Sequence, residues 1–357
     1  MPPFSRKRPI IKSEISRILI RATNWVGDVV MTLPALEAVR ECFPNCTISV
    51  LAKPWVIPLF ESHPMVNEVI PLNKRKDLLA GLLDTIKISQ VIRRKGFDMA
   101  ILFQNAFEAA LIAYLSCIKK RVGFNTEHRG FLLSHPITKE YEKKGNHQVE
   151  YYLSILRNIG CKGESKDPVL FLSDEYKEKG LAILTNKGVQ QQDILLGLSP
   201  GAIFGSAKRW PPDRFASIGD WAVGKWGAKL VILGSIKEIE ICNEVSNRMK
   251  HPSINLSGKT DLGEAMGVIN RCNLFISNDS GLMHVAAALK VPLVAVFGST
   301  DPVATGPRGP ASVIVQHRID CAPCLKPDCH TDFRCMLDIK PEEVWDRLEA
   351  LKERYVR

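Results

Sequence analysis

The chain has 357 residues, of which 45% are hydrophobic and 24% charged, values that are ordinary for a globular protein whose length favours two domains. No apolar run reaches the roughly 18 residues that cross a bilayer, and no uncharged core follows the basic residues near the start, which argues against a membrane-spanning protein and a secretory signal and predicts a cytosolic one. The formal net charge is +10, and residues 1–160 hold 23 Lys and Arg against 14 Asp and Glu, so the excess lies in the first half.

Short apolar segments alternate with helical patterns through that first half. Strands are predicted at residues 18–20, 48–52, 69–72 and 99–103. Helices are predicted at residues 29–42, 78–92 and 106–118. This alternation predicts a parallel sheet that is covered on both faces.

Basic runs supply most of the positive excess of this half. They are Lys74-Arg75-Lys76, Arg93-Arg94-Lys95, Lys119-Lys120-Arg121 and Lys143-Lys144. Each run alone is typical of a solvated helix end, whereas the bias of the whole half predicts an anionic partner such as a phosphate-bearing polymer or a membrane surface.

The second half repeats the alternation of strands and helices. Strands are predicted at residues 194–198, 229–233, 274–276 and 292–297. A polar stretch at 162–192 is the predicted connection, and an amphipathic helix at 341–355 presents Val344, Leu348 and Leu351 on the side expected to pack back on the first half. The sequence therefore predicts two Rossmann-like domains, residues 1–172 and 173–340, closed by residues 341–357.

Two clusters in the second half follow predicted strands directly. Asp279, Ser280 and Gly281 come after the strand at 274–276 and open a helix whose first N–H groups suit an anion such as a nucleotide phosphate. The stretch 199–211 contains Ser199 and Gly201 and brings the positive charges of Lys208 and Arg209 to the end of another strand, which suits a diphosphate. In open α/β sheets, ligands bind at such carboxyl ends of the strands.

The ten cysteines divide into a scattered group and a clustered group. The scattered ones are interpreted as buried apolar residues rather than a disulfide framework: Cys42, Cys46, Cys117, Cys161, Cys242 and Cys272. The clustered ones are Cys321, Cys324, Cys329 and Cys335. Their spacing is short for a zinc ribbon, so free thiols are favoured, with bound metal and a redox-sensitive pair as alternatives.

Three motifs in this order resemble the ADP-heptose:lipopolysaccharide heptosyltransferases of glycosyltransferase family 9. They lie at residues 21–34, at 200–211 and at 278–284. The resemblance runs nearly end to end and implies a GT-B fold, in which two Rossmann-like domains face a central cleft. It also implies an ADP-heptose donor and an acceptor built on lipid A that carries Kdo and one heptose. Because Lys208 and the N–H groups after Ser280 and Gly281 would meet the charge of the leaving diphosphate, no cofactor or catalytic metal is expected. The four-cysteine segment is similar to one that recurs in a branch of this family.

An inverting sugar transfer needs a base for the acceptor hydroxyl and relief of charge on the departing diphosphate. Asp28 follows Gly27 at the mouth of the first strand and matches the family's catalytic aspartate, although capping of the helix that follows is the commoner role of such a residue. Lys208 is expected to steady the phosphates of the leaving ADP, and Asp279 by the family match to meet the donor sugar.

The other expected contacts are placed less directly by the pattern. Donor contacts are expected from Ser199, Gly201, Arg209, Glu238 at the ribose, Lys259 and Thr260 near the adenine, Ser280, Gly281 and His284. Acceptor contacts are expected from Asn24, Asn105, Arg121 and Arg129. An acceptor in the bilayer implies a peripheral protein on the cytoplasmic face of the inner membrane.

Other readings stay open at this stage. A nicotinamide dehydrogenase is disfavoured because residues 24–28 do not contain a G-x-G-x-x-G pattern. A non-catalytic nucleotide- or polyanion-binding protein could use the same basic half, but the aromatic motifs of single-strand nucleic-acid binders are missing from it, and no nucleic acid partner is expected. Within the family, heptosyltransferase I, heptosyltransferase III and other members are the alternatives, because acceptor choice lies in loops.

Overall fold

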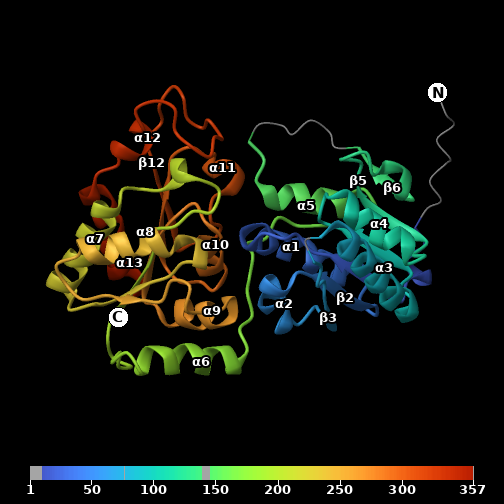
Figure 1. Cartoon of the computed structure of the whole chain (residues 1–357), viewed down its shortest axis with the longest axis horizontal. Coiled ribbons are helices and arrows are strands. Elements are labelled where there is room, and N and C mark those ends of the chain that lie inside the picture. The colour runs from blue at the N-terminus through green and yellow to red at the C-terminus, as the bar shows by residue number, and fades with distance from the viewer. Residues whose placement is uncertain (1–9, 76, 139–144, 357) are drawn as a thin grey trace. The chain divides into compact units, whose positions relative to one another are not determined.

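The computed structural model describes residues 10–75, 77–138 and 145–356. The chain divides into two compact units, the first ending at Lys166 and the second beginning at Asp167. Each unit is built on one sheet of six strands with helices packed around it (Figure 1). The predicted α/β class with two Rossmann-like sheets is confirmed. Over the described ranges, no helix combines the length and the apolar character needed to cross a membrane.

The sheet of the first unit has the strand order β3-β2-β1-β4-β5-β6, and every neighbouring pair is parallel. Its strands are β1 (Arg17–Arg21), β2 (Thr47–Ala52), β3 (Glu68–Pro71), β4 (Met99–Leu102), β5 (Lys120–Phe124) and β6 (His135–Ile137). Its helices are α1 (Val26–Cys42), α2 (Pro58–Glu61), α3 (Leu78–Lys95), α4 (Phe107–Leu115) and α5 (Gln148–Arg157).

The sheet of the second unit has the order β12-β11-β10-β7-β8-β9, again with parallel pairs throughout. Its strands are β7 (Leu195–Ser199), β8 (Lys229–Ile232), β9 (Ile254–Asn255), β10 (Leu274–Asn278), β11 (Leu293–Phe297) and β12 (Ser312–Gln316). Its helices are α6 (Asp174–Thr185), α7 (Pro212–Trp226), α8 (Ile239–Arg248), α9 (Leu262–Arg271), α10 (Gly281–Ala288), α11 (Pro302–Thr305), α12 (Arg334–Leu337) and α13 (Pro341–Tyr355).

Burial on both faces explains why the central strands are mostly apolar and show no alternation of polar and apolar residues. Every residue of β7, β10 and β11 is buried, as expected for parallel strands covered by helices. Local signals fix the helix ends: the Asp77 carboxylate accepts from the Ala80 N–H at the start of α3, and Gly96 adopts the left-handed conformation at its end.

The strand orders place the two predicted site regions at equivalent points. In each sheet the order reverses next to the first strand of the unit, between β1 and β4 and between β7 and β10. The loops that follow these strands leave from the carboxyl edge on either side of the reversal, where doubly wound sheets bind ligands. Asp28 and Asn105 follow β1 and β4, whereas Lys208 and Asp279 follow β7 and β10.

The last helix, α13, packs on the second unit and not on the first half as predicted. The apolar face of α13, which includes Val344, Leu348 and Leu351, lies in the core of the second unit beside residues of β7, β10 and α7. The prediction that this face packs on the first half is therefore wrong. Amphipathicity indicated that one face is buried, but it carries no information about which unit buries it.

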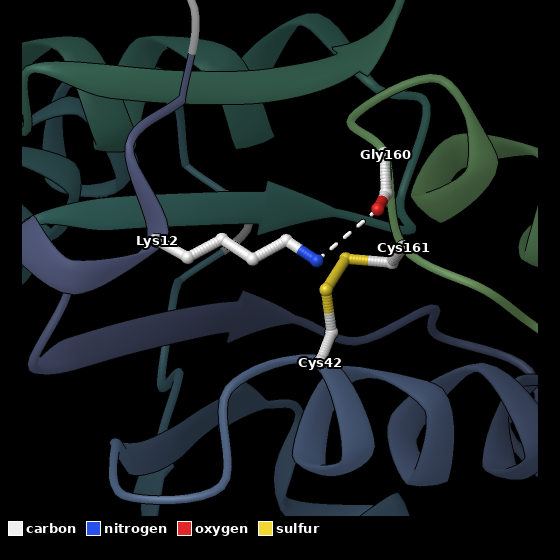
Figure 2. The surroundings of a disulfide bond; sticks show 4 residues. All are labelled: Lys12, Cys42, Gly160 and Cys161. Carbon is white, nitrogen blue, oxygen red and sulfur yellow. Dashed lines mark hydrogen bonds between the residues drawn. A yellow bond between two sulfur atoms is a disulfide. The ribbon is translucent and has the colours of Figure 1, made fainter.

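Two cysteines interpreted as free apolar residues are joined instead. Cys42, at the end of α1, and Cys161, just after α5, form a disulfide across 119 residues of sequence. Figure 2 shows the bond beside Lys12, whose ammonium donates to the Gly160 carbonyl at 3.1 Å. The interpretation of Cys42 and Cys161 as unpaired is therefore wrong, whereas the other eight cysteines are free.

Some sequence predictions fall on residues outside the described ranges. These are the basic start of the chain within residues 1–9, Lys76 of one basic run, and Lys143-Lys144. The assignment of acceptor binding to residues 1–172 and of nucleotide-sugar binding to 173–340 stays a prediction.

Candidate functional site

A buried ion pair is the centre of the site in the second unit. The Lys208 ammonium lies 2.6 Å from Oδ2 of Asp279, and the two side chains are only 14% and 6% exposed. Thr300 donates its hydroxyl to the same carboxylate oxygen at 2.7 Å. The Lys208 ammonium also lies 4.9 Å from the centre of the Phe204 ring, where a cation–π attraction adds to the pair. The cation is thus held at one place by contacts on two sides.

A single amide side chain joins the two loops that carry this pair. Asn278, the last residue of β10, is fully buried. Its Oδ1 accepts from the Trp210 N–H at 3.0 Å, and its Nδ2 donates to the Pro200 carbonyl at 2.8 Å. The Trp210 indole is buried as well and donates to the Ile339 carbonyl. The segment 200–210 and the end of β10 are therefore held at a fixed spacing.

Gly201 is placed where no side chain would fit. A Cβ atom at this position would lie 2.2 Å from Oε1 of Glu238. The other oxygen of that carboxylate accepts from the N–H and the hydroxyl of Ser235, at 2.8 and 2.7 Å, so Glu238 closes a capping box after β8. The predicted ribose contact and the glycine turn are thus neighbours at the carboxyl edge of the sheet.

The other predicted donor residues occupy the same edge in different states of exposure. Ser199 is buried at the end of β7, and Ser280 is the N-cap of α10, where its hydroxyl accepts from the Met283 N–H. Gly281 opens that helix and is half-buried, and His284 is buried one turn further on. Arg209 donates to the Ala202 carbonyl at 3.3 Å.

Lys259 and Thr260 precede α9. Lys259 is exposed and donates to the Asn255 carbonyl at 2.9 Å, and Thr260 is half-buried.

The segment that contains the four clustered cysteines packs against the loop that carries Lys208. The Pro327 carbonyl accepts from the Ala207 N–H at 2.9 Å, and Asp328 accepts from the Ser206 hydroxyl at 2.7 Å. A Cβ atom on Gly205 would lie 2.0 Å from the Pro327 carbonyl oxygen, so the two segments touch backbone to backbone. The segment therefore helps to fix the position of Lys208.

The charges of the other thiols in that segment act on Cys335. Burial raises the pKa of the Cys335 thiol to about 11, and the charges of Cys329, Cys321 and Cys324 add to the shift. Among the described residues, no group of three or more His, Cys, Asp or Glu side chains is arranged to hold a metal ion. All four cysteines are free in the structure, and bound metal and a redox-sensitive pair stay open as alternatives.

Asp28 lies in the first turn of α1, two residues after the helix begins at Val26. The helix begins earlier than predicted, so Asp28 is inside it, and the N-cap position belongs to Trp25. The Asp28 carboxylate accepts a hydrogen bond from the hydroxyl of Tyr152 on α5. Burial, and next the charge of Asp28, hold the pKa of Tyr152 well above its ordinary value. Tyr152 is therefore a neutral donor toward a half-buried carboxylate.

The predicted acceptor residues differ in how much of them a ligand could reach. Arg129 is fully buried, its pKa is lowered to about 10 by that burial, and it donates to the Phe124 carbonyl at 2.9 Å and to Asn105 at 3.1 Å. Arg121 donates to the Leu132 carbonyl at 2.6 Å. These bonds argue against a direct acceptor contact for Arg129 and give Arg121 a structural role.

Asn24 and Asn105 are half-buried at the carboxyl edge of the first sheet. Oδ1 of Asn24 accepts from Arg21 at 2.9 Å, and Nδ2 of Asn105 donates to the Tyr151 hydroxyl at 2.6 Å. Both remain candidates for acceptor contacts.

Sequence reasoning missed Tyr152, Thr300 and Asn278 as members of these sites. Asn278 stands inside a quoted motif, but its role as a bridge depends on a partner 78 residues away. Thr300 follows the strand at 292–297, and its place beside other strand ends was a usable signal. Nothing in the local pattern marks Tyr152, which lies among apolar residues of an ordinary amphipathic helix.

Comparison with known proteins gives one consistent family. Residues 85–333 match the family model described as glycosyltransferase family 9 (heptosyltransferase). Lipopolysaccharide heptosyltransferase 2 of Escherichia coli K12 is 30% identical over 344 residues, which cover 94% of this chain and 98% of that protein.

Solved structures agree with that result. The E. coli ADP-heptose lps heptosyltransferase II is 28% identical, with a TM-score of 0.80 over 95% of this chain and 99% of that one. A family 9 glycosyl transferase from Veillonella parvula is 25% identical, with a TM-score of 0.84 over 95% of this chain and 97% of that one.

Proposed function

Because the chain belongs to glycosyltransferase family 9, the heptosyltransferases, we propose that it is an inverting enzyme that moves L-glycero-D-manno-heptose from ADP-heptose to the first heptose of the lipopolysaccharide inner core. This is the activity of a heptosyltransferase II. The full-length likeness to heptosyltransferase 2 favours it over the alternatives within the family.

The observation that carries the donor half of the proposal is the Lys208–Asp279 pair at the reversal of strand order in the second sheet. Departure of ADP places negative charge on its diphosphate. A cation that is already fixed by Asp279 and the Phe204 ring needs no reorganisation to meet that charge. Asp279 has a second carboxylate oxygen with which to accept hydrogen bonds from heptose hydroxyls.

The reaction needs one proton acceptor, and we assign Asp28 to it. The acceptor hydroxyl oxygen attacks the anomeric carbon of the heptose on the face opposite the phosphate, and the bond from that carbon to the phosphate oxygen breaks. The electron pair leaves with ADP, and the hydroxyl proton passes to the Asp28 carboxylate. Inversion at the anomeric carbon follows from this single displacement. This displacement requires no cofactor, and we expect no catalytic metal.

The remaining donor contacts are proposed from their positions on the second sheet. Glu238 would hold the ribose hydroxyls next to Gly201, as acidic residues do in nucleotide-binding folds. The N–H groups that follow Ser280 would face the phosphates.

The cellular setting is proposed from charge and substrate. The acceptor is a lipid, and the positive excess of residues 1–160 attracts anionic headgroups. We place the protein at the cytoplasmic face of the inner membrane as a peripheral protein.

A transfer assay with purified protein, ADP-heptose and defined lipid acceptors tests the function. Asp28→Asn is expected to lower transfer by a factor of at least about 10² while ADP affinity stays within about twofold, because only the proton acceptor is removed. Glu41→Gln changes the charge equally at the other end of α1 and serves as the control. Equal loss of transfer and ADP affinity in Asp28→Asn would contradict the assignment. Wild-type binding without turnover would favour the non-catalytic alternative.

A further inference from the structure

Three cations meet at the carboxyl edge of the first sheet, and the proposed function uses none of them. Arg21 ends β1, Lys53 comes directly after β2, and Lys74 comes three residues after β3. These strands are neighbours in the sheet, and Arg21 is in register with Leu51. The backbone continues this alignment beyond the strands, since the Ala22 N–H donates to the Leu51 carbonyl at 3.1 Å. The three residues are therefore brought to one place by the sheet itself.

Within the described part of the chain, Glu108 is the carboxylate whose charge acts on all three cations. Glu108 lies 2.8 Å from the Lys74 ammonium. Lys53 makes no ion pair or hydrogen bond with any described residue. Burial lowers the pKa of Lys53, Glu108 opposes the shift, and the charges of Arg21 and Lys74 deepen it. The cluster thus carries two positive charges in excess at a partly desolvated edge.

Arg21 stays positively charged at neutral pH although it is buried. It is 2% exposed and donates to Oδ1 of Asn24 at 2.9 Å, whereas its Nε has no partner among the residues described. A buried guanidinium costs free energy that its bonds to carbonyls offset only in part. Burial lowers its pKa to about 10, which still leaves it charged at neutral pH.

Two exposed indoles border the cluster. Trp55 is 55% exposed and donates through Nε1 to the Asn24 carbonyl at 2.8 Å, and the Lys53 ammonium lies 6.0 Å from its ring centre. Trp25, in the same loop as Asn24, is 62% exposed. Large aromatic faces left in water beside charged groups are typical of surfaces that bind a ligand with both apolar and ionic parts, such as an acidic saccharide.

We propose that Lys53 and Lys74 bind a carboxylate or phosphate group of the acceptor saccharide, and that Trp55 packs against its sugar ring. Arg21 supplies a fixed positive charge behind them. Asn24 contacts both Arg21 and Trp55, and it lies four residues before Asp28. An anion held here positions the acceptor next to the loop that carries the proposed base. The inference rests on the proposed function for the identity of the acceptor.

This subsite replaces an expectation that the structure does not favour. Arg129 and Arg121 were expected to meet acceptor anions, but their guanidinium groups are bonded to carbonyls inside the unit. Lys53 is also positively charged, and its ammonium makes no ion pair or hydrogen bond with any described residue.

The experiment compares Lys53→Gln with Lys119→Gln, which removes the same charge from an exposed residue at the opposite, amino edge of the sheet. Acceptor Kd is measured by titration calorimetry and acceptor KM by the transfer assay. Lys53→Gln is expected to raise both about tenfold or more, the effect of one charge-assisted contact. The KM for ADP-heptose and kcat at saturating acceptor are expected to stay unchanged. Lys53→Arg is expected to recover most of the loss, and Lys119→Gln to resemble the wild type.

Two modified acceptors identify the anion. One lacks the phosphates, and the other has its Kdo carboxyl reduced to an alcohol; the effect of Lys53→Gln is expected to vanish with whichever group the site binds. An acceptor Kd that does not respond to Lys53→Gln, or that responds equally to Lys119→Gln, would overturn the subsite. A wild-type protein that binds the acceptor but transfers no heptose would instead contradict the proposed function.

Discussion

Removing the Cys42–Cys161 disulfide is expected to destabilise the first unit selectively. The bond joins Cys42, at the end of α1, to Cys161, just after α5 (Figure 2). The helices α1 and α5 also pack along each other (Figure 1). Since α1 carries Asp28 and α5 carries Tyr152, the cross-link holds together the two helices that meet at the proposed base. The perturbation is Cys42→Ser with Cys161→Ser, or chemical reduction.

The size of the effect follows from the 119 residues that separate the two cysteines. In the chain-entropy model, closing a loop of this length removes about 16 cal/mol/K from the unfolded ensemble, or about 5 kcal/mol at 25 °C. A typical domain is stable by only about 5–15 kcal/mol, so the loss is a large part of the total. Each 1.4 kcal/mol is about a factor of ten, and the slowest amides of β1, β2 and β4 are expected to exchange about 10³-fold faster.

Hydrogen exchange followed by mass spectrometry resolves the two units separately. Peptides from β10 and β11 in the second unit serve as an internal reference. Cys117→Ser removes an exposed free thiol and is the matched control. Thiol labelling of the unfolded chain is expected to count eight free cysteines before reduction and all ten afterwards.

Either of two results would refute this reasoning. Ten reactive thiols without reductant would mean that the bond does not form in the protein. Unchanged exchange in the first unit after verified reduction would mean that the unfolded chain gains little freedom from losing the cross-link.

Three further results are expected from the site. Lys208→Ala should weaken ADP binding by roughly 10- to 100-fold and lower turnover with it, because a charge-assisted contact to the phosphates is lost; calorimetric affinity equal to wild type would remove Lys208 from the donor site. Tyr152→Phe removes a neutral hydrogen-bond donor from the Asp28 carboxylate, so that carboxylate becomes easier to protonate and the acid limb of the kcat–pH profile should move up by about one pH unit. The control variant Tyr151→Phe should leave the acid limb in place. Identical profiles for the wild type and both variants would argue against the contact between Tyr152 and Asp28. Transfer should persist in EDTA, and activity lost to the chelator and restored by a metal would contradict a metal-free mechanism.

The sequence predicted the strands that are buried on both faces and also the partly exposed edge strand β3, but it missed four others. Residues 18–20, 274–276 and 292–297 are uninterrupted apolar runs, residues 48–52 are interrupted only by Ser49, and each segment lies within a strand or overlaps most of one. The strands that went unpredicted are short or partly exposed: β5, β6, β9 and β12. Three of them lie at sheet edges, where one side of the strand needs no apolar partner.

Contacts between distant residues could not be predicted from local pattern. Lys208 and Asp279 were each expected at the donor, but their direct pairing joins residues 71 positions apart. Likewise, spacing alone did not distinguish Cys42 and Cys161 from isolated buried thiols. Arg129 was likewise expected at the acceptor from its charge alone, and its bonds to Phe124 and Asn105 could not be foreseen from local pattern.

Asn278 has a consequence for how the donor loops can move. Its amide offers an acceptor to one segment and a donor to the other, so neither a carboxylate nor a hydrocarbon of the same size could satisfy both neighbours. A shift of the segment that carries Lys208 would break a bond in a fully buried position, and the polar groups left unpaired there would cost free energy. We therefore expect the segment that carries Lys208 and the loop that carries Asp279 to move together as one rigid unit.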